Sequence, residues 1–139
     1  MNWRSPWISI RSNLELSFMG SRMGQDNLND LTLRLRQFAA DRDWDRFHSP
    51  KNLAMALTGE AGELAAEFQW LTEAESQELD PERLERVKQE TADVLLYLVR
   101  LADKLQFDLL LAAHEKIEHN ARKYPSDQVR GSARKYNEY

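Results

Sequence analysis

The sequence of 139 residues contains no cysteine, which excludes a disulfide framework, a thiol nucleophile and a cysteine-ligated zinc site. It also lacks any run of about 18 apolar residues, so we expect no segment that spans a membrane. No stretch alternates apolar and polar residues as a strand would, and no segment is repeated. Hydrophobic residues make up 42% of the chain, enough for a core, and the length predicts one domain. The absence of cysteine fits a cytoplasmic protein.

Positive charge is scarce in the middle of the chain. The formal net charge is -4, but residues 1–24 and residues 123–139 each carry +2, which leaves -8 for residues 25–122. An acidic middle argues against binding to the backbone of a nucleic acid. It is compatible with a phosphate ligand only if a metal ion stands between the phosphates and the carboxylates.

Apolar residues recur at three- and four-residue steps along several stretches, which predicts helices. The Ser-Pro pair at residues 49–50 and the Asp-Pro pair at residues 80–81 each join a capping residue to a proline at the first helical position. Residues 72–80 form an acidic connection that we expect to be solvated. The expected helices cover residues 26–42, 50–71, 81–105 and 109–123. The predicted fold class is therefore all-α, a four-helix bundle whose core is completed by oligomerisation.

The two ends of the chain lack this periodicity. In residues 1–24, Arg11 and Glu15 interrupt the apolar stretch, whereas a secretory signal needs an unbroken run of about 7–15 apolar residues. We expect residues 1–24 to be a disordered leader, since termini are mobile unless they dock onto the domain. Residues 25–125 are expected to form the helical domain, and residues 126–139 a mobile polar tail.

Two acidic motifs inside apolar helices carry the clearest chemical signal. Glu60 and Glu63 are three residues apart in the second expected helix. Glu90 and Asp93 have the same spacing in the third, and residues three apart lie on one face of a helix. One such pair is usually a solvated surface, but two pairs flanked by core residues are much less common. Four carboxylates facing one another would repel, and a hard divalent cation with oxygen ligands, Mg²⁺ or Mn²⁺, relieves that repulsion.

The segments around these acids resemble a known family. "GEAGELAAEFQW" at residues 59–70 and "ETADVLLYLVRLA" at residues 90–102 resemble the MazG-like all-α nucleoside triphosphate pyrophosphohydrolases, in particular their dCTP pyrophosphatase branch. The likeness covers about residues 28–125. The family pattern is Glu-Glu-x-x-Glu, a spacer, and Glu-x-x-Asp. This chain matches it except at the leading acid, where Gly59 stands, a departure from the general pattern that the dCTP branch resembles.

The resemblance implies an enzyme that hydrolyses a nucleoside triphosphate, dCTP or a modified pyrimidine deoxynucleotide, to the monophosphate and pyrophosphate. It also implies a homotetramer built as a dimer of dimers. The implied catalytic and Mg²⁺-binding residues are Glu60, Glu63, Glu90 and Asp93. One rival keeps this chemistry but changes the substrate to other or oxidised triphosphates. A second rival is a non-catalytic helical oligomerisation module whose acids are merely solvated.

Aromatic residues and a late basic cluster are candidates for substrate contacts. By themselves, aromatic residues at helical spacing are usually core, and basic residues near a helix C-terminus are usually a solvated face. Bases stack on aromatic rings for about 1–3 kcal/mol each. The resemblance favours a base pocket and phosphate contacts over those plainer interpretations. The predicted substrate-binding residues are Trp44, His48, Trp70, Tyr97, Lys116, Asn120, Lys123 and Tyr124.

Overall fold

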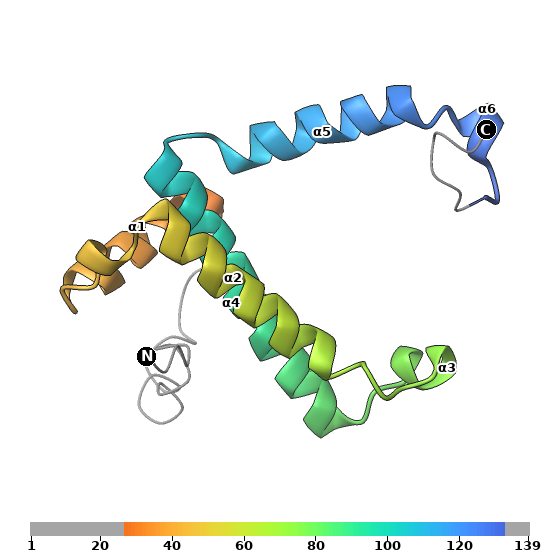
Figure 1. The fold of residues 1–139 in the computed structure, drawn as a ribbon, viewed down its shortest axis with the longest axis horizontal. Coiled ribbons are helices and arrows are strands. Elements are labelled where there is room, and N and C mark those ends of the chain that lie inside the picture. The colour runs from red at the N-terminus through yellow and green to blue at the C-terminus, as the bar shows by residue number, and fades with distance from the viewer. Residues whose placement is uncertain (1–26, 133–139) are drawn as a thin grey trace. The chain divides into compact units, whose positions relative to one another are not determined.

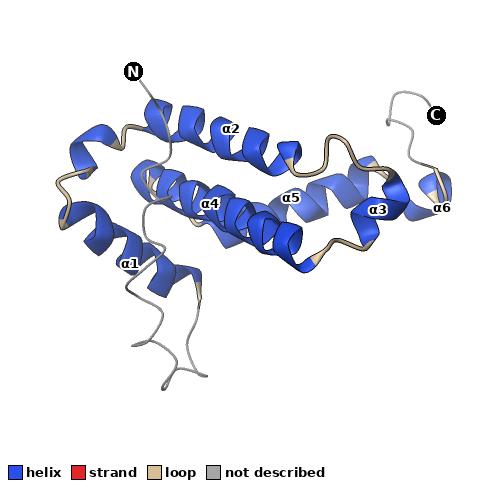
Figure 2. Ribbon diagram, turned by 90° about the horizontal axis from the view of Figure 1, so that it is seen from below, coloured by secondary structure: helices blue, strands red, loops and turns tan. Residues whose placement is uncertain are grey.

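A computed structural model of the protein describes residues 27–132, which contain helices and turns and no strand (Figure 2). The all-α class is therefore confirmed, and the predicted leader over residues 1–24 lies outside the described range. None of the described helices has the length and apolar character that crossing a membrane requires. The elements are α1 (Leu28–Ala40), the 3-10 helix η2 (Asp45–Phe47), α2 (Pro50–Ala66), α3 (Glu73–Gln77), α4 (Pro81–Leu105), α5 (Leu109–Lys123) and α6 (Ser126–Val129).

The chain divides into two compact units, one that ends at Leu105 and one that begins at Gln106. In the first unit α2 and α4 lie side by side along their length, and α1 packs against α4 (Figure 1). Apolar side chains from all three helices form the buried core of this unit. These are Leu35 and Ala39 of α1, Leu53 of α2, and Tyr97, Val99 and Ala102 of α4. The core thus sits where α4 meets its two neighbours.

Side-chain caps begin the helices where the sequence predicted. Ser49 accepts a hydrogen bond from the backbone N–H of Asn52 at 3.2 Å, and Pro50 opens α2. Asp80 accepts from the N–H of Arg83 at 2.9 Å before α4. Asp108 caps α5 in the same way. Each cap satisfies an N–H group that has no partner inside its helix, which explains why local sequence sufficed to place these starts.

The second helix ends earlier than predicted, at Ala66 rather than near Leu71. Its last turn tightens, because the N–H of Glu67 donates to the carbonyl of Leu64 at 3.3 Å. The carbonyl of Glu67 then accepts from Nη1 of Arg83 on α4 at 3.2 Å. A partner from another helix therefore takes a carbonyl that a longer α2 would have used.

Part of the expected connection over residues 72–80 is helical. It is largely exposed, as predicted, but α3 forms within it on a capping box. The N–H of Thr72 donates to the carboxylate of Glu75 at 2.8 Å, and the N–H of Glu75 donates to the Thr72 hydroxyl at 3.3 Å. The Thr-x-x-Glu pattern is a local signal for this motif. The short helix α6 likewise lies inside the segment predicted as a polar tail.

Candidate active site

Three carboxylates from α2 and α4 come together in the first unit. Glu60 lies on α2, Glu90 and Asp93 lie on α4, and one oxygen from each lies within 4.8 Å of the others. Glu60 is only 4% exposed and its Oε2 atom is shielded from solvent, whereas Glu90 and Asp93 are half-buried. The three-residue spacing sets the face of α4 that carries two of them, and the packing of α2 on α4 supplies the third.

The electrostatics of this cluster reflect its crowding. Burial raises the pKa of the Asp93 carboxyl, and the charge of Glu63 raises that pKa further. Glu63 itself is exposed, and it is not among the three acids whose oxygens meet. A bound cation would act in the opposite direction, because positive charge favours the ionised carboxylate.

The donor set fits a hard divalent cation. All three meeting groups are carboxylates, and in the described part of the chain no histidine joins them. Oxygen ligands of this kind suit Mg²⁺ and Mn²⁺, while zinc and iron sites usually include nitrogen or sulfur. Glu60, Glu90 and Asp93 are therefore the residues that would hold such an ion, with Glu63 beside them.

The predicted aromatic contacts of the first unit occupy different environments. Tyr97 is 5% exposed and follows Asp93 by one turn of α4. Trp44 packs edge-on against Phe38 of α1, with ring centroids 5.7 Å apart. Trp70 lies beyond the end of α2 and is 87% exposed. Tyr97 is thus part of the core, while Trp70 presents an open ring face.

Four of the predicted contacts belong to the second unit. Lys116, Asn120 and Lys123 are exposed on α5, and Tyr124 follows its last turn. The ammonium of Lys123 lies 5.7 Å from the centroid of the Tyr124 ring, and the N–H of Tyr124 donates to the carbonyl of Asn120 at 2.8 Å. Their assignment to substrate phosphates stays a prediction.

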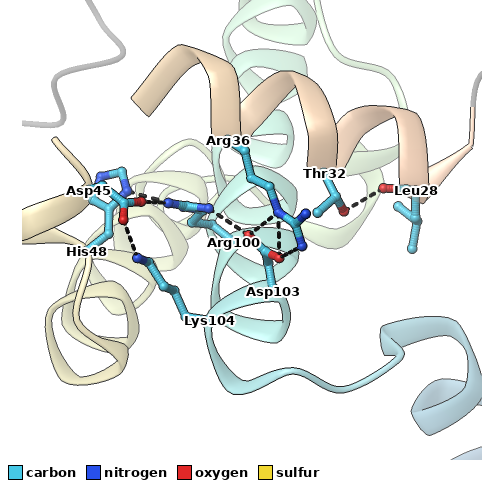
Figure 3. A network of polar contacts seen from close by, with 8 residues as sticks. All are labelled: Leu28, Thr32, Arg36, Asp45, His48, Arg100, Asp103 and Lys104. Atoms are coloured by element: carbon cyan, nitrogen blue, oxygen red, sulfur yellow. Dashed lines mark hydrogen bonds and ion pairs between the residues drawn. The ribbon is translucent and has the colours of Figure 1, made fainter. Parts of the chain in front are cut away.

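The structure also shows a charged network that no sequence motif indicated (Figure 3). Arg100 of α4 is buried, and its Nε donates to Nδ1 of His48 at 3.3 Å. Its Nη1 donates to Asp103 at 2.6 Å, and its Nη2 donates to Asp45. The available signal was Arg100 itself, the one charged residue in the apolar run of residues 94–102.

Two outer cations extend this network. Arg36 of α1 donates from Nε to Asp103 at 2.9 Å, and the Nζ of Lys104 donates to Asp45 at 2.8 Å. The Arg36 hydrogen bond holds the pKa of Asp103 below its ordinary value, and the Lys104 hydrogen bond does the same for Asp45. Both carboxylates therefore stay ionised around the buried Arg100.

The fold and this cluster define the class: an all-α protein with a carboxylate cluster that could hold a cation between two packed helices. Residues 56–139 match the MazG-like family. The dCTP pyrophosphatase 1 of Homo sapiens is 45% identical over 116 residues, which cover 82% of this chain and 68% of that protein. The Rattus norvegicus protein of the same name is 44% identical over 114 residues, covering 81% and 67%. The chain belongs to the MazG-like family.

A solved structure agrees with this membership. The crystal structure of a pyrophosphatase from Archaeoglobus fulgidus superposes with a TM-score of 0.68 at 37% sequence identity. The match covers 76% of this chain and 98% of that one. The chain is therefore similar in both sequence and fold to a pyrophosphatase of known structure.

Proposed function

We propose that the protein is a Mg²⁺-dependent nucleotide pyrophosphohydrolase that converts a nucleoside triphosphate to the monophosphate and pyrophosphate. The observation that carries the proposal is the meeting of Glu60, Glu90 and Asp93 within 4.8 Å on two packed helices. The substrate is dCTP or a modified pyrimidine deoxynucleotide, in keeping with the dCTP pyrophosphatases that share 45% and 44% identity with the chain. Such an activity removes unwanted triphosphates from the nucleotide pool.

The positions of the acids support a role for each. Glu60, Glu90 and Asp93 would hold the ion, and we assign Glu63 as the fourth acid of the site because its charge reaches Asp93. Mg²⁺ held by these acids would supply positive charge that offsets the charge of the triphosphate and lowers the pKa of a nearby water. The side chain of Glu60 is buried and cannot turn freely towards solvent, so the ligand that α2 provides has a fixed position. With a cation bound, the mutually repelling carboxylates would form a site that accepts a polyanion.

The substrate contacts are assigned in two groups. Trp44, His48, Trp70 and Tyr97 form the base site, and the 87% exposed ring of Trp70 is the most open surface for stacking. The phosphate contacts are Lys116, Asn120, Lys123 and Tyr124, whose cations are exposed on α5. Cationic and amide donors of this kind suit phosphate oxygens.

A panel of triphosphates tests the proposal. Pyrophosphate release is measured with dCTP, 5-methyl-dCTP, dTTP, dATP and 8-oxo-dGTP, each with Mg²⁺ and with EDTA. We expect the highest kcat/KM for the cytosine nucleotides and no release in EDTA. A preference for the oxidised purine would keep the chemistry and replace the substrate. No release from any nucleotide would favour a non-catalytic oligomerisation module.

Glu63→Gln tests the fourth acid. The variant removes one negative charge at constant side-chain size, so we expect loss of turnover with far-UV circular dichroism nearly unchanged. Glu63 is exposed, and its loss should not disturb the packing of α2 on α4. Turnover at the wild-type rate would remove Glu63 from the site while leaving the other three acids.

We propose in addition that the chain assembles as a homotetramer, a dimer of dimers, which completes the four-helix bundle. Large apolar side chains remain exposed on the single chain, and α5 alone carries Leu110 at 52%, Leu111 at 56% and Ile117 at 62%. Sedimentation velocity of Ile117→Glu should show smaller species than the wild type. His119→Glu places the same charge at a polar position of α5 and should keep the wild-type mass. A monomeric wild type would contradict the assembly.

A further inference from the structure

Arg100 connects the helix that carries the acids with the predicted base contact His48. It lies seven residues after Asp93 on α4, which is about 10 Å along the helix axis. From there its Nε donates to Nδ1 of the His48 ring at 3.3 Å (Figure 3). A nucleotide whose phosphates met the acids would extend over a comparable distance to its base.

This contact determines which ring nitrogen of His48 carries the proton. A guanidinium offers only donors, so Nδ1 must accept with its lone pair. A neutral imidazole with an unprotonated Nδ1 carries its proton on Nε2. Burial lowers the pKa of His48, the charges of Arg100 and Lys104 lower it further, and only Asp45 acts in the opposite direction. The neutral ring is thus favoured.

Arg100 is itself held in one position. Its Nη1 and Nη2 donate to Asp103 and Asp45, and its side chain is 5% exposed. Asp103 is fixed in turn by Arg36, and Asp45 by Lys104. The guanidinium therefore has little freedom to rotate its Nε–H away from His48.

We propose that Arg100 is a positioning residue that locks His48 in the tautomer protonated on Nε2, so that His48 offers the base one fixed hydrogen-bond donor. The inference rests on the proposed function, because it takes His48 as a base contact. In the described part of the chain Nε2 of His48 has no hydrogen-bond partner, and the ring is only half-buried. The donor is therefore available to a ligand.

A fixed donor distinguishes the pyrimidines. Cytosine has an unprotonated N3 on its pairing edge, whereas N3 of uracil and thymine carries a proton. O2 accepts in all three bases, so the discrimination depends on His48 donating to N3. A donor facing a donor leaves both unsatisfied, and sites built around such a hydrogen bond reject the mismatched analogue strongly. The Arg100–His48 pair thus favours cytosine nucleotides over dUTP and dTTP.

The tautomer can be measured directly. Two-bond ¹H–¹⁵N correlation spectra of the full-length protein with ¹⁵N-labelled histidine, at neutral pH, report the protonation of each ring nitrogen. His48 is assigned by the signals that disappear in His48→Gln. We expect Nε2 protonated and Nδ1 unprotonated in the wild type, and exchange-averaged signals in Arg100→Lys. Lys88→Gln, at an exposed position of α4 that pairs with Glu85 and lies outside the Arg100 network, should leave the pattern unchanged.

The wild-type spectrum decides the matter even if Arg100→Lys does not fold, since a proton on Nδ1 overturns the proposal. Where the variant folds, an unchanged His48 tautomer also overturns it. The activity test is the ratio of kcat/KM for dCTP to that for dUTP. We expect Arg100→Lys to lower this ratio at least about tenfold, mainly by raising KM for dCTP.

The two proposals fail in different ways. A wild type that hydrolyses triphosphates while Arg100→Lys keeps the full dCTP preference overturns the role of Arg100 and leaves the proposed function standing. A wild type that hydrolyses no nucleotide overturns both.

Discussion

The Nε atom of Arg86 on α4 lies 3.0 Å from one carboxylate oxygen of Glu67, the C-cap residue of α2, and 3.1 Å from the other. This bond joins the C-terminal end of α2 to the first half of α4. The negative charge of Glu67 is balanced by Arg86. The carboxyl group of Asp93 has no such balance, because burial and the charge of Glu63 both raise its pKa. Glu60 and Glu67 therefore have different roles, although both belong to the first acidic segment. Glu60 is part of the acid cluster, whereas Glu67 forms an ion pair that connects the end of α2 to α4.

Glu67→Gln tests this division. The substitution weakens an ion pair in which one Nε–H of Arg86 is shared between the two oxygens of Glu67, so we expect a small loss in the free energy of unfolding, measured by urea denaturation. Because Glu67 is not in the acid cluster, kcat should stay within about twofold of the wild type. Loss of turnover at unchanged stability would place Glu67 in the site instead.

Asp93→Asn should stabilise the protein in EDTA at neutral pH. The pKa of Asp93 is raised above its ordinary 3.8, so folding favours its protonated form. That contribution is complete below the unfolded-state pKa and is lost as the pH rises through the folded-state pKa. At neutral pH the ionised carboxylate is therefore unfavourable, and removing its charge raises Tm. Below the ordinary pKa the two proteins should have nearly equal Tm, because the side chain at position 93 is then neutral in both.

Asp103→Asn is the matched control for Asp93→Asn and should have the opposite sign. The Arg36 hydrogen bond lowers the pKa of Asp103, so its stabilising contribution is present at neutral pH and lost as the pH falls. We expect Asp103→Asn to lower Tm at neutral pH in EDTA. If Asp93→Asn also lowered Tm there, the unfavourable charge at Asp93 would be excluded.

Mg²⁺ should stabilise the wild type through the acid cluster. A ligand that binds only the folded state at 100 times its Kd contributes about 2.7 kcal/mol. Thermal unfolding with and without Mg²⁺ should therefore show a higher Tm for the wild type and for Glu67→Gln. Asp93→Asn should show little change, since one of the three meeting carboxylates is gone. Equal shifts in all three proteins would mean that the ion binds elsewhere.

Gly59→Ala examines the space beside the cluster. A Cβ atom added at Gly59 meets no other atom within 4 Å, and the residue lies inside α2. Alanine should then raise the free energy of unfolding by about 1 kcal/mol, because glycine is a poor helix former. Activity should be retained if the space has no function. Loss of activity at higher stability would show that a substrate or a partner chain approaches the helix at this point.

Local chemistry made the helix starts predictable, and tertiary contacts account for much of what was missed. Ser49 and Asp80 cap their helices through their own neighbours, so the sequence alone locates them. The end of α2 depends on Arg83 of α4, which donates a hydrogen bond to the carbonyl of Glu67, the C-cap residue of α2. The helix α3 is a different case, since the Thr72 capping box is local and could have been recognised from its pattern.

The candidate site shows the same division. Helical spacing puts Glu90 and Asp93 on one face, but it cannot tell which acid of α2 turns inward. The packing of α2 on α4 decides that Glu60 is buried and Glu63 exposed. Two partners of Arg100, Asp45 and His48, precede it by 55 and 52 residues, so no local pattern could assemble the whole network.

The most direct test of the acid cluster compares two acids on the same helix. Glu90 belongs to the cluster, while Glu85 is 60% exposed and pairs with Lys88 at 3.6 Å. Pyrophosphate release from dCTP with Mg²⁺ is measured for wild type, Glu90→Gln and Glu85→Gln. We expect Glu90→Gln to lose more than about a hundredfold in kcat/KM and Glu85→Gln to match the wild type. Equal rates for both variants would contradict a catalytic cation site at these carboxylates.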